Sequence, residues 1–164
     1  MTQVLIRDAR PDDFVSIVAL NEVEVQQTSA MDESRLQLLS SMACYLKVAV
    51  VDDTVAAFLL AFRDHAAYEN ANYEWFAARF PTFVYVDRIV VSSAFFGLKI
   101  GSLLYQDLFA FAQTQGISAI TCEYNIQPPN PASKAFHDKF GFKQLGSQWV
   151  ANGTKEVSLQ AAEI

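Results

Sequence analysis

The sequence predicts one α/β domain in which a mixed central sheet is flanked by helices. Three observations support this prediction: the length of 164 residues, the hydrophobic share of 52%, and an alternation of β-rich and helix-like segments. A chain of this length suits one domain and is short for two, so residues 1–164 are expected to form a single domain. The expected order, β-α-α-β-β-β-α-β-α-β-β, joins a hairpin to strand–helix–strand units. Such an order predicts both parallel and antiparallel neighbours in the sheet.

At the start of the chain, residues 4–7 form the first predicted strand, and Pro11 begins the first predicted helix. Proline suits the first helical position because the N–H that it lacks would have no partner there. A second helix is predicted from about Asp32. The side chains of this helix that we expect to face the core are Leu36, Leu39 and Ala43.

The next segments change to a β pattern. Residues 45–51 and 55–63 are rich in β-forming side chains and flank a turn at 52–54, which predicts a hairpin. Residues 64–82 mix aromatic and polar side chains without a clear period and are expected to be irregular. A loop of this length inside a compact domain is usually functional or covers a site.

A strand–turn–helix unit follows. Residues 83–91 form a predicted strand, 92–99 a turn, and Ile100 begins an amphipathic helix that Gly116 ends. The apolar side chains expected on the inner face of this helix are Ile100, Leu103, Leu104, Leu108 and Phe111.

The last third predicts a strand, a helix and a hairpin. Residues 117–124 form the strand, and Asn130 with Pro131 provides the cap and first position of the helix. The expected inner face of that helix consists of Ala132, Ala135, Phe136 and Phe140. A strand begins at 142–145, and Asn152-Gly153 predicts a closing hairpin with a two-residue type I′ turn.

Composition narrows the class of protein. The net charge of −6 argues against a nucleic-acid partner, which needs a basic surface, and weakly favours a cationic substrate. The longest apolar run, 55–62, is far below the ~20 residues that cross a bilayer. The N-terminus lacks a basic stretch followed by an apolar one, so a cytoplasmic protein is expected. Cys44 and Cys122 show no metal-ligand spacing and are expected to be reduced, buried thiols.

The strand–turn–helix unit at 85–112 is the most informative segment for function. A helix that begins directly after a tight turn presents main-chain N–H groups that bind phosphate. Gly97 and Gly101 would equally serve tight turning and close helix packing. From this segment alone, phosphate binding and a purely structural turn both remain open.

Three stretches together resemble the GCN5-related N-acetyltransferase (GNAT) superfamily, in its bacterial type. VDRIVVSSAFFGLKIGSLLYQDL (86–108) is similar to the central strand and pyrophosphate turn of that family, and NPASKAFHDKFGF (130–142) to its Asn-x-x-Ala/Ser-x-x-Phe-Tyr-x-x-x-Gly-Phe helix. VLIRDARPDDFVSIVAL (4–20) is similar to its opening strand and helix. The resemblance covers nearly the whole chain. It implies direct transfer of an acetyl group from acetyl-coenzyme A to a primary amine, without a metal.

The resemblance also implies which residues bind the cofactor. The family turn, Arg/Gln-x-x-Gly-x-Gly/Ala, falls on Phe96, Lys99 and Gly101, of which only Gly101 is kept. Lys99 either keeps its amide on the diphosphate or impairs the turn. The implied turn residues are Phe96, Gly97, Leu98, Lys99, Ile100, Gly101 and Ser102. The strand residues implied to meet the pantetheine arm and thioester are Ile89, Val90 and Val91, and the coenzyme-facing helix residues are Asn130, Ser133 and Phe136.

The resemblance places three candidate catalytic residues. Asp87 and Glu123 are candidate bases for the amine, and His137 stands where the family often has a tyrosine that protonates the leaving thiolate. Each also has a structural interpretation. Asp87 would pair with Arg88 or Arg63, Glu123 would be a solvated charge at a strand end, and His137 would lie exposed on its helix. Asn130 would be an ordinary helix cap.

The sequence says least about the residues that bind the acceptor amine. By family analogy, Tyr68, Tyr73 and Trp75 line an acceptor pocket, with Glu24 in the segment 22–31 as the opposite wall. A hydrophobic cluster or a dimer contact explains the aromatic residues equally well. The family often dimerises, which leaves a homodimer open. The acceptor amine is unidentified. A non-catalytic acyl-CoA-binding module and a structural partner protein are the alternative functions.

Overall fold

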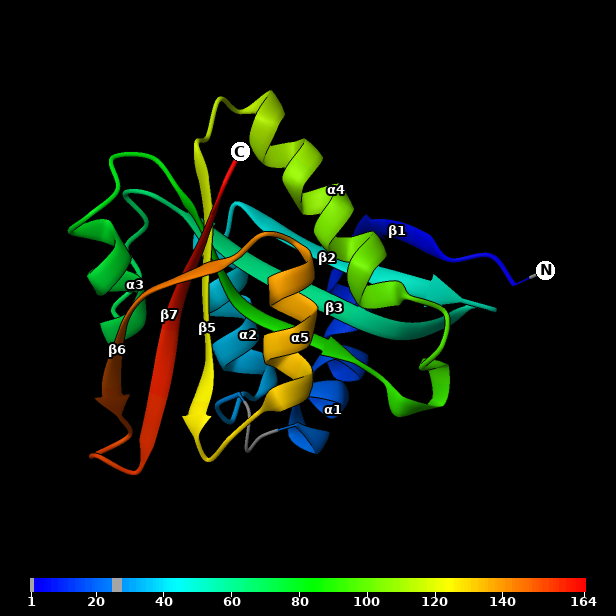
Figure 1. The fold of residues 1–164 in the computed structure, drawn as a ribbon. Helices are drawn as coiled ribbons and strands as arrows, with labels where there is room; N and C mark the ends of the chain where they lie inside the picture. Colours follow the sequence, from blue (N-terminus) through cyan, green and yellow to red (C-terminus); the bar gives the residue numbers. More distant parts are fainter. Residues whose placement is uncertain (1, 25–27) are drawn as a thin grey trace. The chain divides into compact units, whose positions relative to one another are not determined.

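The computed structural model describes residues 2–24 and 28–164 (Figure 1). It contains strands β1 (Leu5–Asp8), β2 (Tyr45–Val51), β3 (Thr54–Arg63), β4 (Val84–Val91), β5 (Ala119–Gln127), β6 (Lys143–Val150) and β7 (Lys155–Glu163). The α-helices are α1 (Phe14–Val23), α2 (Glu33–Met42), α3 (Ala71–Ala77), α4 (Ile100–Thr114) and α5 (Pro131–Lys139). The predicted order is confirmed except for α3, which the sequence did not indicate.

The strands form a mixed sheet in the order β1-β2-β3-β4-β5-β7-β6. β4 and β5 are parallel, with Val84 opposite Ile120, whereas the pairs β1–β2, β2–β3, β5–β7 and β6–β7 are antiparallel. The expected mixed sheet is therefore confirmed. Its parallel pair is joined through α4, as a parallel connection requires a crossover segment.

The chain separates into two compact units. Unit 1 comprises residues 1–62 and 87–111, and unit 2 comprises residues 63–86 and 112–164. Both β4 and α4 begin in one unit and end in the other.

Unit 1 contains the β2–β3 hairpin and the first two helices. The strands are joined by Asp52 and Asp53, whose φ values of 48° and 62° are those of a type I′ turn. Asp32 caps α2 by accepting a hydrogen bond from the Arg35 amide at 2.7 Å. Leu36 and Leu39 are fully buried, as predicted, whereas Ala43 follows the helix and is partly exposed. On α4, Leu103 is exposed, so its predicted inward position is wrong.

In unit 2, the prediction of an irregular segment at 64–82 is wrong, because α3 lies within it. The side chain of Asn70 caps this short helix by accepting hydrogen bonds from the amides of Asn72 and Tyr73 at 3.0 and 3.1 Å. Tyr73 and Phe76, three residues apart, lie on one face and are buried. Burial of this face stabilises a helix whose apolar pattern is too short to predict it.

The inner face of α5 also differs from the prediction. Ala132 and Ala135 are exposed, Phe136 and Phe140 are partly exposed, and His137 is buried. The His137 ring contacts Tyr124 of β5 and Phe142, with centroid distances of 5.6 and 5.2 Å. Tertiary packing against these rings therefore rotates the buried face by about one residue relative to the apolar pattern of the sequence.

The closing hairpin is longer in its loop than predicted. Val150 pairs with Lys155, so four residues, 151–154, connect β6 to β7. Ala151, Asn152 and Gly153 all have positive φ. The predicted two-residue type I′ turn is therefore wrong. Strand pairing stops at Val150 and Lys155, whereas a two-residue turn at Asn152-Gly153 would pair residues 151 and 154.

Candidate functional site

The predicted pyrophosphate turn lies at the start of α4 in unit 1. β4 ends at Val91, and a short 3-10 turn follows at Ser93–Phe95, where the Ser92 hydroxyl accepts a hydrogen bond from the Ala94 amide at 3.3 Å. The main-chain bonds of α4 begin with the Leu103 amide, which donates to the Lys99 carbonyl at 3.1 Å. The amides of the preceding helical residues therefore stand at the positive end of the helix.

Lys99 has the backbone conformation of a glycine. Its φ is +57°, in the left-handed region, and the φ of Gly97 is +98°. A left-handed conformation costs a residue with a side chain about 1–2 kcal/mol. The turn thus keeps a glycine-type path at the position where the family has glycine, even though lysine occupies it. A Cβ at Gly97 would meet no atom within 4 Å, so this glycine serves its φ rather than a close contact within the chain.

The other predicted cofactor residues of unit 1 surround this turn in sequence. Phe96 is 67% exposed, Val90 is buried, and Ile89 and Val91 are partly exposed on β4. The alternation is that of a strand with one covered face. Any contact that these strand residues make through main-chain atoms is compatible with their apolar side chains.

Asp87 on β4 forms an ion pair. Its Oδ2 accepts a hydrogen bond from Arg88 Nε at 3.1 Å, and both side chains are 6% exposed. The expected pairing of Asp87 with Arg88 is therefore present. The role of Asp87 as a base stays a prediction.

In unit 2, Asn130 begins α5 as its cap. Its Oδ1 accepts a hydrogen bond from the Ser133 amide at 3.3 Å, as the structural interpretation of this residue predicts. Ser133 Oγ lies 3.2 Å from His137 Nδ1, and the Phe136 ring contacts that of His137 at a centroid distance of 5.3 Å. Ser133 and Phe136 thus contact His137 on the same helix, and Asn130 caps that helix.

His137 is buried, so its predicted exposed position on the helix is wrong. Burial lowers the pKa of the imidazole below its ordinary value. Its Nδ1 lies 2.7 Å from the Ser133 carbonyl oxygen, which can only accept, and this assigns the proton to Nδ1. Both observations favour a neutral ring at neutral pH, and the role of His137 as the acid stays a prediction.

Tyr124 of β5 lies beside His137. Its ring lies 5.6 Å from that of His137, and its hydroxyl accepts a hydrogen bond from Gln160 Nε2 at 3.1 Å. Burial raises the pKa of this phenol, so it keeps its proton at neutral pH. Glu123, the preceding residue on β5, is partly exposed.

The predicted acceptor aromatics are packed into unit 2. The Tyr73 hydroxyl donates to the Arg63 carbonyl at 2.6 Å and accepts from the Ala66 amide at 3.0 Å. Its ring contacts those of Tyr68 and Phe83, at centroid distances of 5.6 and 5.5 Å. Tyr68 and Tyr73 are both buried, as the hydrophobic-cluster interpretation predicts.

Trp75 is partly exposed, and its ring contacts Arg79 and the backbone of β6. The Arg79 guanidinium lies 3.5 Å from the centroid of its ring, and Arg79 Nη1 donates to the Trp75 carbonyl at 2.8 Å. A Cβ on Gly146 of β6 would lie 2.8 Å from the Trp75 ring, so the ring rests directly on that backbone. Glu24 ends α1, and its carbonyl accepts from the Thr28 amide at 3.0 Å. Residues 25–27 of the expected wall lie outside the described residues.

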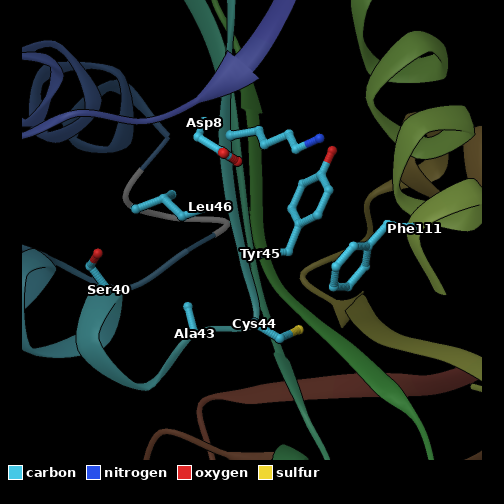
Figure 2. A pocket seen from close by; sticks show the side chains of 8 residues that line it. Asp8, Ser40, Ala43, Cys44, Tyr45, Leu46 and Phe111 are labelled. Atoms are coloured by element: carbon cyan, nitrogen blue, oxygen red, sulfur yellow. The ribbon is translucent and has the colours of Figure 1, made fainter. Parts of the chain in front are cut away.

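Unit 1 also contains a cavity that the sequence analysis did not foresee. Its volume is about 330 Å³, and Asp8, Ser40 and Leu46 lie on one side of β2 with Tyr45 and Phe111 on the other (Figure 2). The complete lining consists of Asp8, Ser40, Ala43, Cys44, Tyr45, Leu46, Lys47 and Phe111. Phe111 is eleven residues beyond Ile100 on α4, about 16 Å along the helix. The cavity is therefore separate from the predicted pyrophosphate turn.

Two polar side chains of the lining, those of Tyr45 and Lys47, are bonded to Asp107, which is not itself a lining residue. Asp107 Oδ2 accepts from the Tyr45 hydroxyl at 2.7 Å and from Lys47 Nζ at 2.8 Å. Burial alone would raise the pKa of Asp107, but these two hydrogen bonds lower it. Cys44 is partly exposed here, so the prediction of two buried thiols holds for Cys122 alone.

Metal-binding clusters and membrane-spanning helices are both absent from the described residues. Residues 2–24 and 28–164 contain no group of three or more His, Cys, Asp or Glu side chains arranged to hold a metal ion. Among the same residues, no helix combines the length and apolar character needed to cross a bilayer.

Solved structures share this fold. Ard1 from Thermoplasma volcanium matches with a TM-score of 0.79 and 14% identity, covering 98% of this chain and 97% of that one. A GNAT-family acetyltransferase from Streptococcus pneumoniae matches with a TM-score of 0.73 and 22% identity, covering 99% of each chain. Naa50 from Arabidopsis thaliana, solved with a bisubstrate analogue, matches with a TM-score of 0.75 and 15% identity, covering 98% of this chain and 99% of that one. At these identities the likeness establishes the fold.

The family is shown by a match of the sequence to a family profile. No curated protein matches the chain. The profile of the Acetyltransferase (GNAT) family, in contrast, matches residues 6–142, which include most of β1, the turn before α4 and the whole of α5. The mixed seven-stranded sheet is the architecture that the order of the predicted elements indicated. The chain therefore belongs to the GNAT family of acetyltransferases.

Proposed function

We propose that this chain transfers an acetyl group from acetyl-coenzyme A to a primary amine, by direct attack in a ternary complex. Family membership supports an acyltransferase. The observation that carries the proposal is the glycine-like φ of Lys99 at +57°, because it preserves the turn before α4 despite the change of residue. A preserved turn keeps the main-chain donors on which diphosphate binding depends.

Main-chain groups do most of the cofactor binding in this proposal. The amides from Phe96 to Ser102 hold the diphosphate, and the Lys99 ammonium adds a positive charge. On β4, Ile89 and Val91 offer main-chain groups to the pantetheine arm, as an added strand would. The amide near Val90 and Val91 polarises the thioester carbonyl, on which negative charge develops. In unit 2, the residues proposed to face the coenzyme are Asn130, Ser133 and Phe136.

The transfer needs one base and one acid. The amine nitrogen attacks the thioester carbon, a C–N bond forms, and the C–S bond breaks to release coenzyme A as a thiolate. Asp87 or Glu123 takes the proton that the nitrogen loses, directly or through water. We assign the proton that the thiolate gains to Tyr124, because its phenol is protonated at neutral pH and its ring lies beside that of His137, at a centroid distance of 5.6 Å. A neutral His137 then serves as a hydrogen-bonding neighbour rather than as the acid.

Residues 1–164 are proposed to work as one GNAT-like domain in the cytoplasm, without a nucleic-acid partner. The net charge of −6 supports the last point, because phosphate neutralisation needs basic side chains. The partly exposed Trp75 and Glu24 remain the proposed acceptor-side residues, and the buried Tyr68 and Tyr73 would act there only through packing. A homodimer is compatible with the exposed Leu145 and Trp149 of the edge strand β6.

Several structural neighbours suggest acceptors to test. Naa50 was solved with the analogue CoA-Ac-MVNAL, the NatC complex with a Gag peptide and coenzyme A, and another neighbour is a putative phosphinothricin N-acetyltransferase. A peptide α-amine and a small amino acid are therefore the first two acceptor classes to test. Spermidine adds a cationic amine, which the acidic chain would attract.

The test has two steps. Titration calorimetry with acetyl-coenzyme A measures binding, and thiol release then measures turnover with the peptide Met-Val-Asn-Ala-Leu, phosphinothricin and spermidine. Binding with amine-dependent thiol release supports the proposal. Binding without turnover favours a non-catalytic acyl-CoA-binding module, the alternative that the departures at Phe96 and Lys99 suggest. No heat at millimolar cofactor contradicts both.

A further inference from the structure

Arg88 is a buried cation that joins two distant segments of unit 1. It lies on β4, and its side chain is 6% exposed. Besides the bond from Nε to Asp87, its Nη1 donates to Asn21 Oδ1 at 3.1 Å and to the main-chain carbonyl of Ser29. One guanidinium thus contacts the candidate base, the last turn of α1, and the segment that leads into α2.

Asn21 closes this arrangement from the other side. It is fully buried in α1, and its Nδ2 donates to the Ser29 carbonyl at 2.8 Å. The Ser29 carbonyl therefore accepts from both Asn21 and Arg88, so the three residues form a closed set of hydrogen bonds. Met31, two residues farther on, is buried, which anchors the same segment through apolar packing.

Stability alone is a weak reason to bury an arginine here. The desolvation of a buried guanidinium costs much of the free energy that is gained from its ion pair. A packed apolar side chain of similar volume often stabilises a fold equally well. A guanidinium differs from an apolar side chain in its rigid, directional set of donors. The arrangement therefore provides defined positions for Asp87 and Ser29.

We propose that Arg88 is a positioning residue: it ties the segment at Ser29 to β4 and orients the carboxylate of Asp87 toward the acceptor amine. The inference deepens the proposed function and rests on it. Asp87 touches the reacting nitrogen in this scheme, and Arg88 acts through Asp87. Asn21 supports Arg88 from the opposite side.

A double-mutant cycle tests the coupling between Arg88 and Asp87. The variants are Arg88→Met, Asp87→Asn and the double variant, assayed by thiol release with whichever probe among Met-Val-Asn-Ala-Leu, phosphinothricin and spermidine the wild type acetylates fastest. We expect Arg88→Met to lower kcat/KM for the amine at least tenfold, with the Kd for acetyl-coenzyme A changed less than twofold. The double variant should be no worse than Asp87→Asn, because both changes remove one function. Additive losses, or no loss in Arg88→Met, would overturn the proposal.

Conservative and control variants separate positioning from general damage. Arg88→Lys keeps the charge and loses the fork of donors, so its kcat/KM should fall between those of the wild type and Arg88→Met. Arg35→Met, at an exposed arginine of α2 in the same unit, should leave both constants unchanged. If Arg88→Met does not fold, Asn21→Leu replaces it, because this change removes the neutral partner and leaves the ion pair. Unchanged amine kinetics in Asn21→Leu would then overturn the role of this arrangement.

Amide hydrogen exchange of residues 29–31 tests the anchoring without any turnover. We expect exchange to become at least tenfold faster in Arg88→Met and unchanged in Arg35→Met. Equal protection in Arg88→Met and the wild type would overturn the anchoring. A wild type that releases no thiol with any amine contradicts the proposed function instead, and the exchange result then decides the role of Arg88 in anchoring by itself.

Discussion

The turn before α4 and the helix α5 depart from the family pattern in opposite ways. In the turn, the residue has changed from glycine to lysine, yet Lys99 keeps a left-handed φ of +57°. In α5, the Asn130 cap and the closing Gly141-Phe142 are kept, yet His137 is buried and carries its proton on Nδ1 toward Ser133. A site built from main-chain amides tolerates a change of side chain, whereas a site built from side chains changes its chemistry with its surroundings.

The largest effect expected is that of Gly101→Pro in the turn. Proline removes the main-chain N–H of the second residue of α4 and disfavours the helical conformation of Ile100 before it. The affinity for acetyl-coenzyme A, measured by calorimetry, should fall about a hundredfold or more, because a lost charge-assisted donor and a distorted turn add together. Gly101→Ala keeps the amide and should retain affinity within a few-fold. Equal affinities for wild type and Gly101→Pro would remove the diphosphate from this turn.

A second effect concerns the side-chain site in unit 2. Tyr124→Phe removes the proposed proton donor and should lower kcat about a hundredfold, with little change in the Kd for acetyl-coenzyme A. His137→Phe should lower kcat much less, because burial keeps the imidazole neutral. The measurement is thiol release at saturating substrates for both variants. A larger loss in His137→Phe than in Tyr124→Phe would reverse the assignment.

A third prediction concerns pH and stability. The folded pKa of His137 is lower than its unfolded value, so the unfolded chain binds more protons and stability is lost as pH falls below about 6.5. The loss from this group ends once the pH falls below the folded pKa. Urea unfolding at pH 7.5 and 5.5 measures the loss, and His137→Gln should make it smaller. An unchanged difference in His137→Gln would assign the loss to other groups.

The smallest effect returns to the turn. Lys99→Gly relieves a left-handed strain of about 1–2 kcal/mol in the folded chain. Glycine also increases the conformational entropy of the unfolded chain, which lowers the free energy of unfolding by about 0.5–1 kcal/mol. The expected net result is a free energy of unfolding raised by about 0.5–1 kcal/mol. Lys139→Gly, in the last turn of α5, should instead lower it. Destabilisation by Lys99→Gly would mean that the lysine side chain contributes more than its backbone costs.

Much of the candidate site was predictable because it depends on position along the chain. The turn falls directly between β4 and α4, and Asn130 caps α5, as the spacing of glycine, asparagine and proline indicated. The burial of His137, Tyr68 and Tyr73 was not predictable in the same way, because it depends on rings contributed by β4, β5 and Phe142, the residue before β6. The same holds for the bonds of Arg88, which join residues 67 and 59 positions away in sequence.

The sequence by itself determined the order of the elements, the mixed sheet and the place of the turn, since local propensity, caps and apolar periodicity specify these over a few residues. Only the tertiary structure decided which face of α5 is buried, that α3 exists, and that the closing hairpin has a four-residue loop. The physical reason is that a short helix or turn gains too little energy from its own residues. Packing and strand register contributed by distant segments therefore select among the local alternatives.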